Sequence, residues 1–588
     1  MKNNVSDWQN VLETLKIDLK LPDDAIGLLA LKLKFRLEDI QSVAAESITG
    51  GGDDKKCDIL YVDKELQTAV IAQCYYSKKD RPAAPANKAS DLNAAISWLL
   101  TRDLDALPDG LKGRADELRS AINNGDIKQI YIWYVHNLPS SKNVADELKT
   151  VEKTAKSALR TYANGREINI FAEEIGTSQI TKLYIQAERT IIVTDKLSTK
   201  VSDAIEIHSL DWTSVLTTVK ANWLYDMYHL YETDLFSANL RGYLGSRSSD
   251  SNINNAIKNT ANDEPNNFWV YNNGLTALVI DYKLGARTRA GRKLDINGIS
   301  IVNGAQTTGS IGSLETRPSD NILVPIRFVK VIKDSVITKV VRFNNSQNKL
   351  QAADFRSTDP IQDRLRQEFT KIPDADYEGG RRGGSSDTIK RSKYTLPSYT
   401  VGQSLAAFHG DPVTAYDKKS EIWTSENIYR RVFTDRTTAR HITFCYSLLE
   451  EINSTRLALA QKQRKDDKSL TQIERNHLNF LNKKGASYLI VHVISMCMET
   501  ILDKPISNRT SLQFKANVSP KSAAEYWKKL IALVLSLSNQ LDAAFSRNRI
   551  SNESVLKAVP NFVGVIESLK EIQRPTFTEF AKQVEITN

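Results

Sequence analysis

The chain has few cysteines and histidines, and neither type is spaced like a metal site or a disulfide framework. The four cysteines include no CxxC pair, and the seven histidines include neither HxH nor HxxxH. Local spacing therefore indicates neither a zinc site nor a set of disulfides, although distant residues could still converge. Such sparse cysteine usage fits a reducing cytoplasm, which is where we expect the protein.

Long apolar runs are also absent. No stretch approaches the roughly 18 apolar residues of a membrane span, and the N-terminus lacks the basic and apolar regions of a secretion signal. We therefore expect no membrane association. The phosphate-binding pattern GxxxxGK[ST] and internal repeats are missing as well, so neither a P-loop enzyme nor a repeat array is indicated.

What remains is an ordinary globular composition in a long chain. Hydrophobic residues make up 41% and charged residues 25% of 588 residues, which predicts several folded domains rather than one core. The formal net charge of +9 would suit a protein that meets polyanions over part of its surface.

The first 175 residues predict a mixed sheet flanked by helices. Between a Gly-rich turn and a run of lysines lie two short β-rich segments that predict a hairpin. The expected helices cover residues 5–20, 24–48, 91–100 and 145–162, and the expected strands cover 58–63, 68–76, 127–138 and 166–174.

The hairpin carries residues suited to phosphodiester hydrolysis. Such chemistry needs a hard cation, normally Mg²⁺, held by oxygen ligands, and a positive group near the phosphate. Asp58 opens the first strand, while the side-chain carbonyl of Gln73 and the backbone carbonyl of Cys74 lie on the second. A lysine on the face of Gln73 would stand two residues further on, but that residue is Tyr75, a neutral phenol at pH 7.

This hairpin resembles the PD-(D/E)xK nuclease superfamily, in which an Asp is followed by (E/Q)xK on the next strand. The resemblance implies a restriction-endonuclease-like fold and Mg²⁺, or Mn²⁺ in its place. It also implies that the missing lysine can come from the following helix, which favours Lys88 over Lys78, on the opposite strand face. Glu38 and Glu46 on the preceding helix are further candidate carboxylates, although both could be ordinary solvated charges.

Four motifs in the middle of the chain, taken in order, resemble the AIPR family of abortive-infection phage-resistance proteins. They are DLFSANLRGYLG, NNFWVYNNGLTALV, NGISIVNGAQTTGSI and RFNNSQNKLQAADFRSTDPIQDRLRQEF. With the region that follows, the resemblance covers most of the chain. It implies a role in phage defence.

Several polar residues in these motifs are candidate ligand contacts. NNG after an aromatic strand predicts a type I′ hairpin turn, which alone would explain Asn273, and the same holds for Asn303. Alternatively, amides and hydroxyls at a strand-to-helix turn can hold an anion such as phosphate. The candidate contacts for such a ligand are Arg241, Asn273, Asn303, Gln306 and Thr307. Arg381 and Arg382 lie in a Gly/Arg-rich loop that suits phosphate contacts, or is simply disordered.

The last third shows helical periodicity throughout. The chain is thus predicted to be an α/β and α+β multidomain protein. The expected parts are a nuclease-like domain (1–175), a connector (176–225), an AIPR middle domain (226–400) and a helical C-terminal domain (401–588).

Three functional hypotheses follow. The first is a phage-defence nuclease that uses Mg²⁺ to cut DNA or RNA, with DNA as the expected substrate. The second is a catalytically degenerate sensor whose middle domain binds nucleic acid or a nucleotide. The third is a scaffold for a multi-protein defence system, which neither binds nor cuts without its partner. The expected partners are nucleic acid, and a second copy of the chain or a defence-system protein.

Overall fold

The computed structural model of the chain describes residues 7–19, 21, 24–37, 39–49, 54–188, 191, 193–237, 251–289, 291–332, 340, 353, 356, 359–377, 379, 395–465 and 469–587. Contacts within the chain divide it into two compact units. The first unit joins the N-terminal part, up to Gln179, to nearly all of the C-terminal part. The second is formed mainly by Ile180–Leu350.

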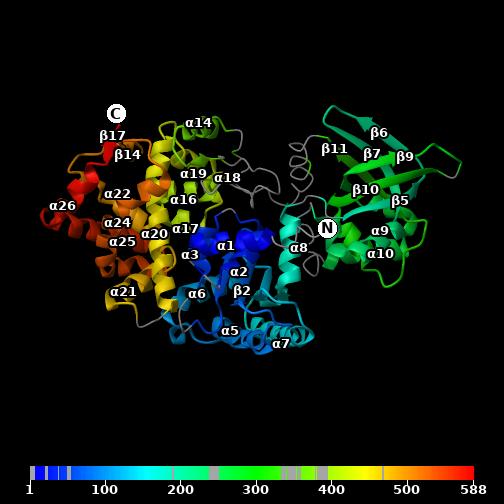
Figure 1. Cartoon of the computed structure of the whole chain (residues 1–588), viewed down its shortest axis with the longest axis horizontal. Helices are drawn as coiled ribbons and strands as arrows, with labels where there is room; N and C mark the ends of the chain where they lie inside the picture. The colour runs from blue at the N-terminus through cyan, green and yellow to red at the C-terminus, as the bar shows by residue number, and fades with distance from the viewer. Residues whose placement is uncertain are drawn as a thin grey trace. The chain divides into compact units, whose positions relative to one another are not determined.

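A four-stranded mixed sheet forms the centre of the N-terminal part (Figure 1). Its strands are β1 (Ile59–Asp63), β2 (Thr68–Tyr75), β3 (Gln129–His136) and β4 (Asn169–Ile175). β1 and β2 pair antiparallel, and β2, β3 and β4 run parallel to one another. The predicted hairpin and mixed sheet are therefore confirmed.

Helices cover both faces of this sheet. On one face, Phe35 at the end of α2 (Ala25–Phe35) stacks on Trp133 of β3, with ring centroids 5.9 Å apart. The other face packs into an apolar core with α5, α6 and α7. These helices span Leu92–Ile96, Asp109–Asn123 and Lys142–Leu159.

The single helix expected over residues 24–48 is wrong. Arg36 adopts a left-handed conformation (φ 51°) and ends α2. A separate helix α3 (Ile40–Ser47) then starts, because the Asp39 side chain accepts a hydrogen bond of 2.9 Å from the Ser42 amide. The helical spacing of apolar residues continues past Arg36, but the cap at Asp39 starts a new helix there.

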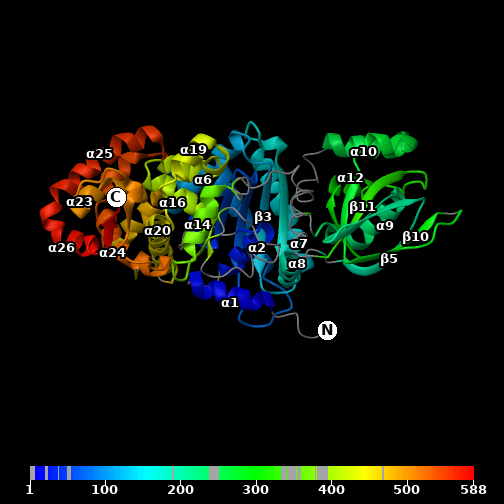
Figure 2. The same ribbon diagram turned by 90° about the horizontal axis from the view of Figure 1, so that it is seen from above.

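The C-terminal part is helical, as predicted. Figure 2 shows the long α20 (Ala439–Lys465) beside α16 (Ser398–Phe408) and α24 (Pro520–Ser536). The remaining long helices are α22 (Ala486–Met496), α25 (Asn552–Ser568) and α26 (Lys570–Ala581). Their core includes Trp527, whose ring lies 4.7 Å from those of Phe444 and Phe580.

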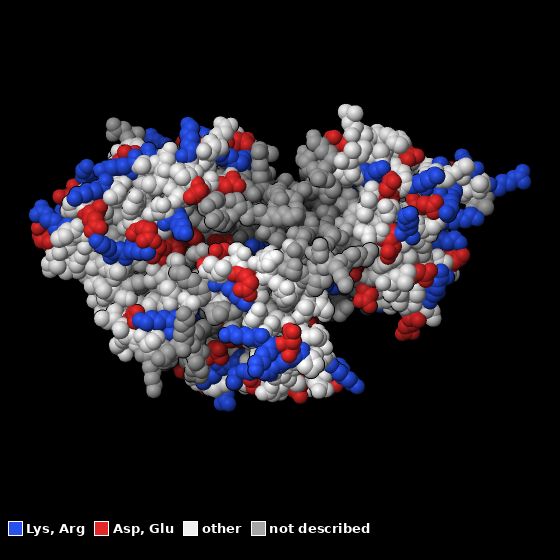
Figure 3. All heavy atoms as spheres, in the orientation of Figure 1, with Lys and Arg blue, Asp and Glu red and all other residues white. Residues whose placement is uncertain are grey.

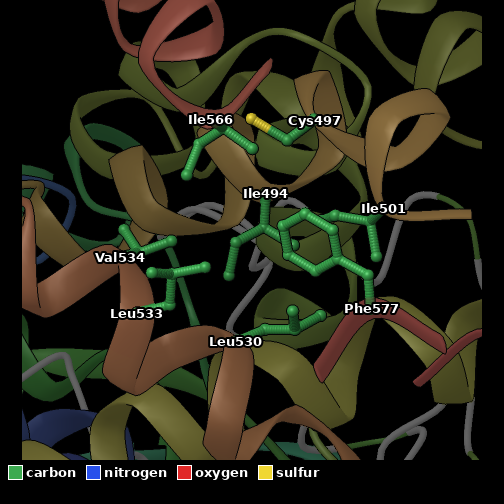
Figure 4. A pocket seen from close by; sticks show the side chains of 8 residues that line it. All are labelled: Ile494, Cys497, Ile501, Leu530, Leu533, Val534, Ile566 and Phe577. Carbon is green, nitrogen blue, oxygen red and sulfur yellow. The ribbon is translucent and has the colours of Figure 1, made fainter. Parts of the chain in front are cut away.

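A small hollow in this helical core, shown in Figure 4, is lined by apolar side chains and one thiol. The lining residues are Ile494, Cys497, Ile501, Leu530, Leu533, Val534, Ile566 and Phe577. With no polar group but a buried thiol to orient a ligand, this hollow is a packing defect rather than a binding site.

The N-terminal and C-terminal parts of the first unit are joined by two ion pairs in which the acid is buried. Lys484 lies 2.7 Å from Glu117 of α6, and Lys419 lies 3.4 Å from Asp63 at the end of β1. In Figures 1 and 2 the blue N-terminal elements and the yellow helices lie side by side. None of the described helices has the length and apolar character needed to cross a bilayer.

The second unit is built on a seven-stranded sheet. The strand order is β5-β10-β8-β11-β7-β6, and β9 pairs with β10. The strands are β5 (Val193–Val201), β6 (Ala204–His208), β7 (Trp212–Lys220), β8 (Leu275–Val279), β9 (Asp281–Leu284), β10 (Arg292–Asn303) and β11 (Leu323–Val331). The helices α9 (Ala221–Tyr231), α10 (Ser251–Asp263) and α12 (Ala305–Gly312) share its apolar core.

The segment 176–225, where we expected a connector, carries regular structure. It forms α8 (Thr177–Glu188) and the strands β5, β6 and β7. Only every fourth residue of β5 is buried, at Val193, Leu197 and Val201, so the alternation that marks a strand is weak in the sequence. Pairing with the distant β10 and β11 supplies the order that local pattern lacks.

Candidate functional site

Asp58 stands at the open end of the β1–β2 hairpin. Its backbone amide donates to the carbonyl of Ala72 (2.9 Å), and its carbonyl accepts from the amide of Thr49 (3.1 Å). Its carboxylate oxygen Oδ2 accepts a hydrogen bond of 2.7 Å from the backbone amide of Cys74. Since Ile59 pairs with Ala72, Asp58 is the cross-strand neighbour of Gln73 on the same sheet face.

The surroundings of Asp58 disfavour its charged form. Burial raises the pKa of Asp58 from 3.8 to about 7. The Cys74 amide opposes this rise, the negative charge of Asp54 adds to it, and the positive charge of Lys88 lowers it. A carboxylate that titrates near neutral pH in a polar cluster is typical of a functional site.

Gln73 offers a second oxygen ligand. Its side chain is 5% exposed, and its Oε1 has no hydrogen-bond partner among the described residues. A buried amide carbonyl left without a partner costs free energy that a cation or a donor would recover. The position beside Asp58 is therefore suited to a hard cation that takes oxygen ligands.

Lys88 lies close enough to Asp58 for its charge to lower the pKa of that carboxyl group. It belongs to the short helix α4 (Ala86–Ser90), which follows the hairpin. Tyr75, which stands where the superfamily motif has lysine, packs against the apolar core, and Lys78 is exposed. Of the two lysines considered from sequence, the structure thus places Lys88 near the carboxylate.

Asp24 joins this cluster, although the sequence analysis did not single it out. Side-chain atoms of Asp24, Asp58 and Cys74 all lie within 4.8 Å of one another, an arrangement that could hold a metal ion. Asp24 is 4% exposed and immediately precedes α2. An acid directly before an apolar helix was the one available signal, and it is more often read as a cap.

Glu46, one of the two expected helix carboxylates, makes its contacts elsewhere. Glu46 of α3 accepts a hydrogen bond of 3.3 Å from the Tyr488 hydroxyl, and its backbone carbonyl accepts from Arg114 (2.9 Å). Glu46 thus links the N-terminal sheet to the C-terminal helices. Glu38 lies outside the described residues.

In the second unit, some of the candidate contacts lie where β10 ends and α12 begins. β10 ends at Asn303, Gly304 adopts φ 95°, and α12 begins at Ala305, so the predicted strand-to-helix turn is confirmed. Thr307 is buried in the first turn of α12 and Gln306 is half-buried. Arg241, Arg381 and Arg382 lie outside the described residues.

A polar row crosses three neighbouring strands beside this turn. Asn303 pairs with Thr276 of β8, and the exposed Arg327 of β11 donates to the Thr276 hydroxyl at 3.0 Å. Arg327 lies in a mostly apolar strand that alternates between buried and less buried positions over most of its length, so no sequence pattern singled it out. Its guanidinium supplies a described cation two strands from Asn303, with Thr276 between them.

The expected hairpin turn at Asn273 is wrong. The aromatic run before it forms the short helix α11 (Phe268–Tyr271), and Asn273 is an exposed residue that leads into β8. Only Phe268 of this run is buried, whereas Trp269, Val270 and Tyr271 are exposed. One buried residue in four fits a helical turn better than a strand with a buried face.

Charges of both signs are mixed on the face of the molecule drawn in Figure 3. On the face drawn in Figure 3, lysine and arginine side chains are interspersed with aspartate and glutamate over both units. The described residues on this face therefore do not produce a uniform positive field.

The fold and the hairpin cluster define a mixed α/β protein with a helical C-terminal region and a candidate cation site. The family model described as AIPR protein matches residues 236–541, more than half of the chain, and the chain belongs to this family. Family membership suggests a role in abortive infection, a form of phage defence. Comparisons with curated proteins and with solved structures returned no match.

The matched range does not include the hairpin. Evidence for chemistry at Asp58 therefore comes from the geometry of the N-terminal sheet and from the resemblance of its motif.

Proposed function

We propose that the chain is a metal-dependent phosphodiester hydrolase that cuts nucleic acid, DNA in the first instance, as its part in phage defence. The observation that carries this proposal is the grouping of Asp58, Gln73 and Lys88 at the mouth of one hairpin. It combines an acid, a buried carbonyl oxygen in need of a partner, and a lysine charge.

The donor set fits a hard divalent cation. Mg²⁺ prefers carboxylate and carbonyl oxygens, which Asp58, Gln73 and the Cys74 backbone would offer. Asp24 adds the second carboxylate that was expected from Glu38 or Glu46. A bound Mg²⁺ would polarise the phosphoryl oxygen and lower the pKa of a water molecule.

The protein's own groups then have distinct tasks. Asp58 must be ionised to bind the cation, so its pKa of about 7 makes metal binding increase as pH rises through neutrality. Lys88 stabilises negative charge that develops on the phosphate oxygens. Tyr75 cannot take that task because a phenol is neutral at this pH.

Cleavage assays test the proposal. Wild type and Asp58→Ala are incubated with plasmid, linear duplex and single-stranded substrates, with Mg²⁺ or with chelator. We expect wild type to cut at least one substrate only with metal, and the variant to cut none. Inert wild type, or an equally active variant, would refute the hydrolase.

Tyr75 in the lysine position favours a second candidate, a sensor that binds without cutting. Its ligand would bind at the second unit, with Arg241, Gln306 and the neighbouring amides as contacts. Binding of a labelled oligonucleotide that falls in Gln306→Ala but is unchanged in Asp58→Ala and in chelator would favour this candidate.

A further inference from the structure

Three chemically different donors meet at the hairpin mouth. Asp24 comes from the start of α2, Asp58 from the residue before β1, and Cys74 from the end of β2. One ligand atom of each, including the Cys74 Sγ, lies within 4.8 Å of the other two. An ion with bonds of about 2.0–2.3 Å would need to draw these atoms together by about 1 Å.

The packing of α2 explains why the thiol faces this cluster. Gly27 stands three residues after Asp24, so both lie on one face of α2. A Cβ added at Gly27 would lie 2.5 Å from the Cys74 Sγ. The helix backbone therefore rests directly against Cys74 and holds its sulfur on the side where Asp24 begins the helix.

The thiol and the unpartnered amide of β2 face opposite sides of the sheet, because side chains alternate along a strand. Cys74 faces α2, whereas Gln73, with its buried Oε1, shares the face of Ile71 and Tyr75, which pack in the other apolar core. The cluster beside α2 thus consists of two carboxylates and a thiol, and the Gln73 oxygen belongs to the Mg²⁺ site proposed above.

A thiol changes which cation such a site prefers. Mg²⁺ takes oxygen ligands, whereas thiolates select Zn²⁺ and similar thiophilic ions, which also accept carboxylates. We propose that Asp24, Asp58 and the Cys74 thiolate bind a thiophilic divalent cation such as Zn²⁺, in competition with Mg²⁺ at the hairpin. The two cations share Asp58, so occupancy by one excludes the other.

The competition rests on the proposed function, in which Mg²⁺ uses Asp58, but the thiophilic site itself does not. When the cation binds, the thiol releases its proton to solvent and the metal–sulfur bond forms without any redox change. Zinc availability would then set how much of the protein is ready for Mg²⁺.

Cadmium absorbance tests this assignment, because Cd²⁺ is a spectroscopic substitute for Zn²⁺ whose bond to a thiolate absorbs in the near ultraviolet. Full-length wild type, Cys74→Ser and Asp24→Asn are titrated with Cd²⁺. Cys497→Ala serves as the matched control, because Cys497 is buried in the apolar hollow of the C-terminal helices. Thermal unfolding without metal checks that each variant is folded.

We expect a saturable thiolate band with one Cd²⁺ per chain in wild type and in Cys497→Ala. The band should disappear in Cys74→Ser, weaken by roughly tenfold or more in affinity in Asp24→Asn, and decrease as Mg²⁺ is added. A band that persists in Cys74→Ser, or that Mg²⁺ does not reduce, overturns the proposal. Cleavage without a cadmium band would defeat this inference alone, whereas a band without cleavage would defeat only the hydrolase.

Discussion

The carboxylate of Asp58 accepts a 2.7 Å hydrogen bond from the backbone amide of Cys74. This bond ties the residue before β1 to the end of β2, where the hairpin ladder has already finished. It fixes one carboxylate oxygen, and the side chain of Asp54 also contacts this carboxyl group. The candidate site is thus held by backbone geometry and does not depend on the lysine that the motif has lost.

Removal of the Lys88 charge should impair catalysis more than binding. We expect Lys88→Met to lower kcat by about 100-fold, because its ammonium stabilises charge in the transition state. KM should change little. Steady-state kinetics on a cleaved duplex measures both, with Lys78→Met as the control, since Lys78 is also a lysine near the hairpin but is exposed. Equal losses in the two variants would contradict the role of Lys88.

Asp58→Asn should stabilise the metal-free protein at alkaline pH. The pKa of Asp58 is about 7 in the folded state and 3.8 in its ordinary surroundings, so the folded protein binds the proton more tightly. The free energy of unfolding therefore falls as pH rises from about 4 to about 7. Above that range the ionised Asp58 still destabilises the folded protein. We expect the variant to gain about 1–2 kcal/mol at pH 8 and nothing at pH 4. Thermal unfolding in chelator at both pH values measures this, and a variant that is less stable at pH 8 would contradict the burial argument.

Gly27→Ala should disturb the sheet beneath α2. The new Cβ would lie 2.5 Å from the Cys74 Sγ and 2.6 Å from the Ile59 Cδ1, so the helix must shift. We expect a loss of about 1–3 kcal/mol in stability together with weaker metal binding. Gly564→Ala in α25 is the matched control, since nothing lies within 4 Å of its Cβ, and it should gain about 0.5–1 kcal/mol. Comparable unfolding midpoints for the two variants would refute the close contact.

Lys419→Met should weaken the joint between the N-terminal sheet and the C-terminal helices. Burial would raise the pKa of Asp63, but Lys419, the Leu66 amide and the Tyr61 hydroxyl together lower it. Asp63 therefore contributes stability that is fully present above its ordinary pKa of 3.8 and is lost as pH falls from there through the lower pKa of the folded state. The Lys419 side chain is 39% exposed, so water screens part of its attraction to Asp63. We expect Lys419→Met to cost about 1–2 kcal/mol at pH 7 and clearly less at pH 3.

Two further variants isolate this ion pair. Lys418→Met removes an exposed lysine that pairs with Glu421 at 3.3 Å and should cost at most about 0.5 kcal/mol. Asp63→Asn combined with Lys419→Met should recover part of the loss, because no uncompensated charge stays buried. Thermal unfolding of all four proteins measures this, and a double variant worse than Lys419→Met would contradict the pairing.

The sequence predicted the hairpin because β-rich runs and turn residues act locally. The choice of Lys88 came from the superfamily resemblance; Lys88 lies close enough to act on Asp58, and its role stays a prediction. Asp24 was missed because its contact with Asp58 depends on how α2 packs across the sheet, which no local pattern encodes. Glu46 shows the converse, because its helix was expected but its side chain turns to Tyr488 of a helix far along the chain.

The second unit shows a different limit. Its motif at Asn303 and Gly304 could be predicted as a strand followed by a turn, since glycine readily adopts the φ of 95° found there. The strands β5, β6 and β7 could not, because mixed burial hides their alternation and their partners lie far along the chain. Whether the candidate contacts of this unit bind an anion stays a prediction.

The most direct test of the catalytic proposal couples metal binding to cleavage in one titration. Calorimetry with Mg²⁺ or Mn²⁺, on wild type and Asp58→Asn at pH 8, is compared with the metal dependence of DNA cleavage. The account predicts that binding and cleavage rise together in wild type and that both disappear in Asp58→Asn. Binding without any cleavage, or cleavage that survives in Asp58→Asn, would contradict it.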